Sequence, residues 1–180
     1  MMPGTAIFLC AHPIQIAPMT DKTVITVGVA DMKVSSDPDS SLITYALGSC
    51  IGLVAYDPMR KLGGLLHLQL PDSQAFGTQG QENPAKFADT GIAALVETLL
   101  ASGASKNRMV IGVFGGANML KDEQVFQIGM RNIRAAKKSL WQAALFIKHE
   151  DVGGTSNRTV SLDLETGLIR VKKDGAYVEY

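Results

Sequence analysis

Cys50 and His67 are the residues whose types and spacing best suit catalysis. Cys50 directly precedes an apolar stretch, Ile51 to Tyr56, and His67 falls within a second one, Leu65 to Leu70; the pattern predicts two strands joined by a turn. Pro58 fits the second position of a type I turn, because its fixed φ is already correct there. With the turn centred just after Pro58, Cys50 lies opposite His67, and opposed residues have Cβ atoms about 4.5 to 5.5 Å apart.

A thiol beside an imidazole is suited to nucleophilic catalysis, because the thiolate is the reactive form and the imidazole supplies acid-base capacity. Thr44 supplies a hydroxyl that can orient the imidazole. Since successive side chains of a strand point to opposite faces, Leu66 and Leu68 share one face and His67 lies on the other. The histidine therefore interrupts an otherwise apolar pattern.

A structural role for the same residues also fits this spacing. A free cysteine often behaves as a small buried hydrophobe, and a single histidine is often satisfied within a fold. A bulge at Gly63 and Gly64 would shift the register by one residue and break the facing. Spacing alone leaves both roles open.

Length and composition describe one globular domain. The 180 residues fit a single core, which we expect to span residues 21–180, after a flexible tail over residues 1–20 that includes Cys10 and His12. The 17 basic residues balance 17 acidic ones, which argues against nucleic acid as a partner. No stretch approaches the roughly 20 apolar residues of a membrane span, so we expect a cytoplasmic protein with no membrane insertion.

Metal binding is not expected, because the two cysteines lack metal-ligand spacing; in the cytoplasm they stay reduced, so a free thiol is available. The glycines of GVFGGANM lack the spacing of a nucleotide-binding loop and predict tight turns. At a predicted helix start, Gly129, Arg131 and Asn132 fit either capping or substrate contact. Trp141 is expected to pack, and His149 to be an ordinary strand residue. The Gln-rich stretch over residues 72–82 is either the rim of a binding groove or a linker.

Strands outnumber helices in the predicted order of elements. The predicted strands are Thr23–Val29, 51–56, 65–70, 108–114, Leu145–His149, Thr159–Leu164 and Leu168–Lys173. One helix is predicted from Pro84 to a stop at Gly103, and a second over 131–144. The face of the first helix that packs on a sheet is predicted to be Phe87, Gly91, Ile92, Leu95, Val96 and Leu99. Hairpins imply antiparallel pairing, so the pattern favours a layered α+β domain.

Two segments resemble the signature of the CheD family: TYALGSC from Thr44 to Cys50 and HLQLP from His67 to Pro71. The similarity continues through PAKFADTGIAALVETLLASGA, GVFGGANM, IGMRN and DVGGTSNRTV, and covers roughly residues 23–173. Ala46 departs from the family, where glycine is common, and Phe87 stands where tyrosine is usual. Neither departure touches the proposed chemistry.

The resemblance implies a protein-glutamine deamidase that converts glutamines of methyl-accepting chemotaxis receptors to glutamate. Cys50, His67 and Thr44 would form the catalytic set, with a thioester intermediate and without cofactor or metal. It also implies a β-sandwich of mostly antiparallel strands with flanking helices, related to bacterial toxin-type cysteine deamidases, and a CheC-type phosphatase as a second partner.

The main alternative is a non-catalytic chemotaxis adaptor that binds receptors and the CheC-type phosphatase. A cysteine protease or transglutaminase is a weaker alternative, because no matching motif set is present.

Overall fold

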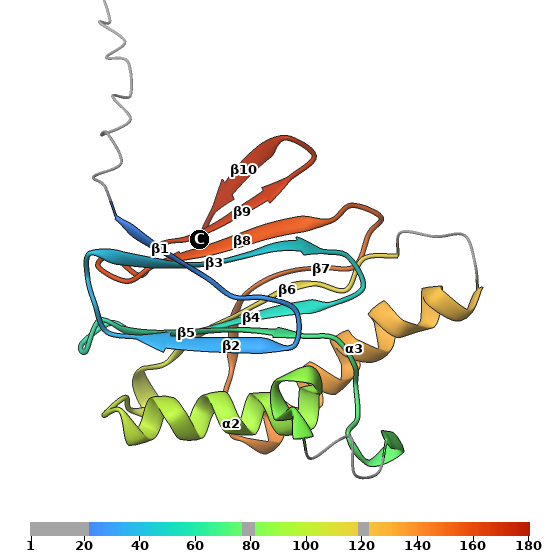
Figure 1. Ribbon diagram of the computed structural model, residues 1–180, viewed down its shortest axis with the longest axis horizontal. Helices are drawn as coiled ribbons and strands as arrows, with labels where there is room; N and C mark the ends of the chain where they lie inside the picture. Colours follow the sequence, from blue (N-terminus) through green and yellow to red (C-terminus); the bar gives the residue numbers. More distant parts are fainter. Residues whose placement is uncertain (1–21, 77–81, 119–122) are drawn as a thin grey trace, which may run out of the picture.

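Two β-sheets lie face to face, and two helices cover the outer face of one of them (Figure 1). The computed structural model describes residues 22–76, 82–118 and 123–180. The predicted tail, residues 1–20, lies outside the described residues, as does part of the Gln-rich stretch. The prediction of a layered α+β sandwich with mostly antiparallel strands is confirmed. None of the described helices combines the length and apolar character that crossing a bilayer requires.

The first sheet has the strand order β1-β3-β8-β9-β10. Its strands are antiparallel except for the parallel pair β1 and β3. The bounds are β1 Thr23–Thr26, β3 Ser40–Leu47, β8 Arg158–Asp163, β9 Ile169–Lys173 and β10 Ala176–Glu179.

The second sheet has the order β2-β5-β4-β6-β7 and is antiparallel except for β6 and β7. The bounds are β2 Asp31–Ser35, β4 Ile51–Asp57, β5 Leu62–Leu68, β6 Val110–Gly115 and β7 Ile147–Val152. No strand was predicted at β2, β3 or β10. The predicted strand Leu145–His149 corresponds to β7, which starts two residues later and ends three residues later than predicted.

Helix α2, Ala88–Ala101, starts later than predicted. Pro84–Lys86 forms a separate 3-10 turn, and Phe87 is extended because it bridges to Leu70 in the manner of a short strand. The predicted stop is confirmed, since Gly103 follows the helix with a positive φ of 95°. A short 3-10 turn, Lys106–Arg108, then leads into β6.

Helix α3, Glu123–Gln142, begins eight residues before the predicted start. Gly129, Arg131 and Asn132 are therefore inside the helix and cap nothing, which corrects the predicted helix start. Gly129 lies against the backbone of Gly116, and a Cβ there would approach the Gly116 carbonyl oxygen to 2.7 Å. A glycine that permits close packing was taken for a helix boundary.

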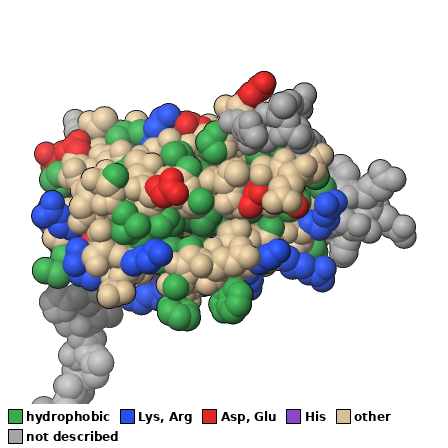
Figure 2. Space-filling model, turned by 90° about the horizontal axis from the view of Figure 1, so that it is seen from below, with side chains coloured by type: hydrophobic (Ala, Val, Ile, Leu, Met, Phe, Trp, Pro, Cys, Tyr) green, Lys and Arg blue, Asp and Glu red, His purple; other side chains and the backbone are tan. Residues whose placement is uncertain are grey.

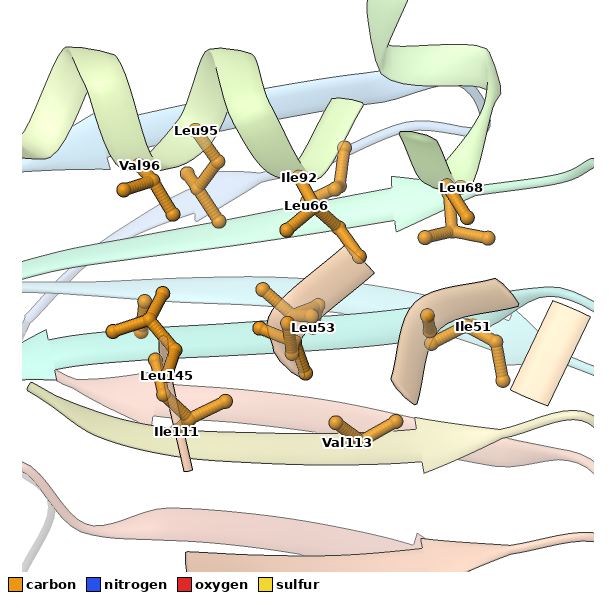
Figure 3. Close-up of a cluster of buried hydrophobic side chains, with 14 of the residues drawn as sticks. Ile51, Leu53, Leu66, Leu68, Ile92, Leu95, Val96, Ile111, Val113 and Leu145 are labelled. Carbon is orange, nitrogen blue, oxygen red and sulfur yellow. The ribbon is translucent and has the colours of Figure 1, made fainter. Parts of the chain in front are cut away.

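The sheet of β4 and β5 separates two apolar cores. On its outer side, leucines and isoleucines of the strands meet α2 and α3 (Figure 3). On its inner side, residues such as Val54, Leu65 and Phe114 meet Leu42 and Val160 of the first sheet. The predicted buried face of the first helix is confirmed, with Phe87, Gly91, Ile92, Leu95, Val96 and Leu99 all buried.

The β4–β5 hairpin has a different register from the predicted one. The type I turn is present, since the Arg60 N–H donates to the Asp57 carbonyl at 3.2 Å with Pro58 at the second position. The loop continues through Lys61, which has a φ of 46°, and the closing pair is Asp57 with Leu62. This moves the register by two residues, so Gly52, not Cys50, lies opposite His67. A shift of two keeps every side chain on its predicted face.

Candidate active site

Thr44 and His67 meet between the two sheets. Thr44 belongs to β3 and His67 to β5, and both are buried, with exposed fractions of 0% and 1%. The Thr44 Oγ1 and the His67 Nδ1 are 2.7 Å apart. His67 lies on the face of β5 opposite Leu66 and Leu68, as predicted, and the structure shows that this is the inner face, where the facing sheet supplies the hydroxyl.

The hydrogen-bond pattern defines the tautomer of His67. The Thr44 hydroxyl has one hydrogen and donates it to the Val27 carbonyl oxygen at 2.8 Å. Since a carbonyl only accepts, the His67 Nδ1 must be the donor to Thr44. The Nε2 then carries the lone pair, and it is buried with no hydrogen-bond partner among the described residues. The site therefore has a basic nitrogen that accepts no hydrogen bond from a described residue.

Cys50 is on the same side of the sheet as this nitrogen. It lies one residue before β4, is half-buried, and packs against the inter-sheet core. Because Gly52 pairs with His67, Cys50 is the diagonal neighbour of the histidine. Such neighbours lie about 7 to 8 Å apart, within reach of a long or aromatic side chain.

Burial favours the neutral forms of both groups. It raises the pKa of the Cys50 thiol, an effect that the Cys50 backbone N–H opposes by stabilising the thiolate. Burial also lowers the pKa of His67 below its usual value. Both shifts favour the uncharged thiol and the uncharged imidazole over a thiolate–imidazolium ion pair.

The backbone around Cys50 is held by the end of β6. The Gly116 N–H donates to the Cys50 carbonyl at 2.8 Å, and the Ala117 N–H donates to the Gly48 carbonyl at 2.7 Å. Gly115 has a φ of 107°, and a Cβ there would collide with the Cys50 carbonyl oxygen. Gly115 and Gly116 of GVFGGANM both have a positive φ, as expected of glycines in a turn, whereas Gly112 lies within β6. The backbone at the glycine pair supports the cysteine segment.

Asn132 is a second support that the sequence analysis did not identify in this role. Its side chain is fully buried, and its Nδ2 donates to the carbonyls of Ser49 and Gln69, both at 2.9 Å. The last β4–β5 pair is Ile51 with Leu68, so the amide group joins the two strands where their ladder ends. The only signal in the sequence is the polar residue on the apolar side of α3.

The remaining predicted residues have simpler surroundings. Trp141 is 77% exposed, so the prediction that it packs is wrong. His149 is in β7, and its ring lies 5.6 Å from that of Tyr180. Among the described residues, no three His, Cys, Asp or Glu side chains gather as metal ligands would.

Comparison with known proteins finds one family over more than half of the chain. The family described as "CheD chemotactic sensory transduction" matches residues 69–173. A protein of Solibacter usitatus named "Probable chemoreceptor glutamine deamidase CheD" is 47% identical over 155 residues, which cover 86% of this chain and 92% of that protein.

Two further relatives have comparable coverage. "Probable chemoreceptor glutamine deamidase CheD 1" of Syntrophus aciditrophicus is 44% identical over 84% of this chain and 94% of its own. A protein of Pyrococcus abyssi with the same name, without the number, is 42% identical over 83% of this chain and 91% of its own.

Proposed function

The chain belongs to the CheD family, and we propose that it deamidates selected glutamines of methyl-accepting chemotaxis receptors to glutamate. The observation that carries the proposal is the hydrogen bond from His67 to Thr44, which leaves the basic Nε2 on the side of the sheet where Cys50 lies. Amide hydrolysis through an acyl-enzyme requires a nucleophile and an oriented general base, and a thiol beside an imidazole can supply both.

In the first half-reaction, the Cys50 Sγ attacks the carboxamide carbon of the glutamine while its proton moves to the His67 Nε2. The Cys50 N–H stabilises negative charge at the sulfur, which makes it a suitable donor to the oxyanion that forms beside it. The carbon–nitrogen bond then breaks, and the departing ammonia takes the proton from Nε2. A thioester joins the receptor to Cys50.

In the second half-reaction, Nε2 accepts a proton from water as the water attacks the thioester carbon. The carbon–sulfur bond breaks, and Nε2 returns the proton to the sulfur. Glutamate and the free thiol result. Water is consumed and ammonia is released, so no step needs a metal or an organic cofactor.

Thr44 orients the base in this scheme. By accepting from Nδ1–H, it fixes Nε2 as the nitrogen that takes up and returns the proton in both half-reactions, and it holds the ring towards the cysteine. The same division of roles, with a nucleophile, a base and an orienting group, recurs in acyl-transfer enzymes of unrelated fold.

The proposal includes a cellular setting. We infer that the protein works in the cytoplasm, where Cys50 stays reduced. A CheC-type phosphatase is its second partner in the proposal, which rests on the family resemblance alone.

The test is the mass of peptides from a recombinant receptor cytoplasmic fragment after incubation with the protein. Conversion of glutamine to glutamate is expected with the wild type and with Cys10→Ala, and none with Cys50→Ala. An unchanged fragment in every sample would contradict the proposal and leave the adaptor function. Cleaved backbone would indicate a protease, and incorporation of an added amine a transglutaminase.

A further inference from the structure

A groove of about 450 Å³ runs between α2 and α3, beside the segment that follows β5. One wall consists of Arg131, Arg134 and Lys138 of α3, and the other includes Asp72 and Asp89. A neighbouring hollow of about 260 Å³, which also includes Asp89, extends it along the two helices. The groove is on the helical face of the molecule, where most of the Lys and Arg side chains lie in one half of the view and most of the Asp and Glu side chains in the other (Figure 2).

The three cations of the α3 wall form no salt bridge within the part of the chain that the structure describes. They are spaced i, i+3 and i+7, which aligns them along one side of the helix. No salt bridge joins any of them to another described residue, whereas Lys137, on the same helix, pairs with Glu150 at 2.8 Å. The positive charge of this wall is available to a ligand.

The carboxylates of the opposite wall already accept local hydrogen bonds. Asp89 accepts from the hydroxyl of Ser73 at 2.6 Å and from its N–H at 3.1 Å. Asp72 accepts from the Gln74 N–H at 2.9 Å. These bonds fix the carboxylates of Asp72 and Asp89, neither of which forms a salt bridge with a described residue of α3. The groove therefore has one cationic wall and one anionic wall. A bound peptide would be oriented with its acidic side chains towards the cationic wall.

Two residues of the groove lie close in the chain to residues that support the Cys50 segment. Arg131 precedes Asn132, whose amide donates to the carbonyl of Ser49, the residue before Cys50. Pro71 of the groove follows Gln69 by two residues, and the Gln69 carbonyl is the other acceptor of the same amide. The groove is therefore connected to the end of the β4–β5 ladder, which Cys50 directly precedes.

We propose that this groove binds the acidic segment of the chemoreceptor that flanks the target glutamine, with carboxylates of the receptor against Arg131, Arg134 and Lys138. The inference rests on the proposed function and adds a determinant of substrate choice to it. A peptide segment is the occupant favoured over an anionic membrane, because the cations line a concave groove between helices, which a flat bilayer surface does not enter.

The test is the charge reversal Arg134→Glu with Lys138→Glu, assayed on a receptor cytoplasmic fragment. The KM for the fragment is expected to rise about tenfold or more, with kcat retained, because two attractive contacts become repulsive. The KM of the wild type should rise with ionic strength, and that of the variant should not. Lys106→Glu with Lys148→Glu is the matched control, since both lysines are exposed, lie outside the groove and give the same change in net charge.

Folding is checked by the alkylation rate of Cys50 with iodoacetamide and by the melting temperature, both of which should match the wild type. A receptor fragment with lysines in place of the acidic residues beside its glutamine should recover its KM with the reversed groove. Equal KM values for the groove variant and the control would overturn the inference while leaving the deamidase intact.

If the wild type fails to deamidate, the proposed function fails, and fluorescence anisotropy of the labelled fragment still tests the groove. Weaker binding by the groove variant than by the control supports it, and equal binding overturns it. Cosedimentation with phosphatidylglycerol vesicles tests whether the groove cations bind an anionic membrane instead. Loss of vesicle binding in the groove variant, with an unchanged KM for the fragment, would assign the cations to lipid and overturn the inference.

Discussion

The two faces of β5 differ by one polar side chain. Leu66 and Leu68 point outward into the apolar cluster under α2. His67, between them in sequence, points inward and meets the Thr44 hydroxyl of the other sheet. One face is built only for burial, and the other includes a buried polar pair within an apolar core. The difference teaches that strand alternation alone is enough to place a base inside a sandwich.

The polar pair has a cost that the apolar face lacks. A buried polar atom without a partner costs about 1 to 3 kcal/mol, and the His67 Nε2 is such an atom among the described residues. Groups of this kind in native folds call for an explanation, and catalysis is one. The comparison predicts that substitutions on the inner face change the chemistry and substitutions on the outer face change the stability.

Replacing the base should have the largest effect. His67→Gln is expected to lower kcat about 10²-fold to 10⁴-fold, the usual contribution of a positioned general base, with little change in melting temperature. Its outward neighbour is the control: Leu66→Ala should cost about 2 to 5 kcal/mol of unfolding free energy and retain kcat below its melting transition. Steady-state kinetics and denaturant unfolding of both variants measure the separation. A kcat loss in Leu66→Ala equal to that of His67→Gln would break the comparison.

Removing the orienting hydroxyl should have the next largest effect. Thr44→Val keeps the shape but deprives the His67 Nδ1–H of its acceptor and the Val27 carbonyl of its donor. We expect kcat to fall about 10-fold to 100-fold, since a misplaced catalytic group has consequences of this size. The free energy of unfolding should fall by about 1 to 3 kcal/mol. Full activity in Thr44→Val would show that the ring needs no orientation from the second sheet.

Loss of the amide that joins the two strands should act on kcat rather than on KM. Asn132→Leu removes both donors to the Ser49 and Gln69 carbonyls, and we expect kcat to fall about tenfold as the cysteine segment loosens. Asn132→Asp should be equally slow, because it cannot donate from an ionised carboxylate. Asn107→Asp, at an exposed position, is the control. If Asn132→Leu retains kcat and only its melting temperature falls, Asn132 contributes to stability and does not position the cysteine segment.

The smallest expected effect is a shift in pH dependence. Because burial lowers the pKa of His67, the base stays neutral at neutral pH, and kcat/KM should fall only below the usual imidazole value of about 6.5. The unfolded chain gains the proton first, so the contribution of His67 to stability is complete above pH of about 6.5 and is lost below it. Rate profiles and unfolding at several pH values test this. An acid limb well above 6.5 would contradict a buried, neutral base.

The sequence predicted which side chains share a face better than it predicted the register of the strands. Alternation placed His67 on the face opposite Leu66 and Leu68, and Thr44, which the resemblance singled out, lies at the imidazole. The predicted β4–β5 register was wrong because the loop is longer than a two-residue turn. The extra length depends on the positive φ of Lys61, a conformation that a lysine in the sequence does not indicate. Ala46 has a φ of 55° at the position where glycine is common in the family. The departure from glycine therefore marked a backbone position with a positive φ, which was not predicted.

Tertiary contacts explain the other misses. Asn132 became identifiable only when α3 was seen to cross the end of the β4–β5 ladder, a contact across more than sixty residues of chain. Strand β2 pairs along one edge of its sheet and is only partly buried, so its sequence has no clear apolar alternation. Strand β3 does alternate in burial, but two of its buried residues, Ser40 and Thr44, are polar, so its sequence resembles a loop. Trp141 lies on the outer side of α3, and hydrophobic character alone gave no sign of that.

The central claim is that the receptor amide passes through a thioester on Cys50, and hydroxylamine tests it most directly. If the acyl-enzyme forms, hydroxylamine competes with water, and the target glutamine becomes a hydroxamate in proportion to the hydroxylamine added, as read by peptide mass. Cys50→Ala should give neither product. Glutamate formed at an undiminished rate, with no hydroxamate at any hydroxylamine concentration, would mean that water attacks the amide directly and would contradict the account.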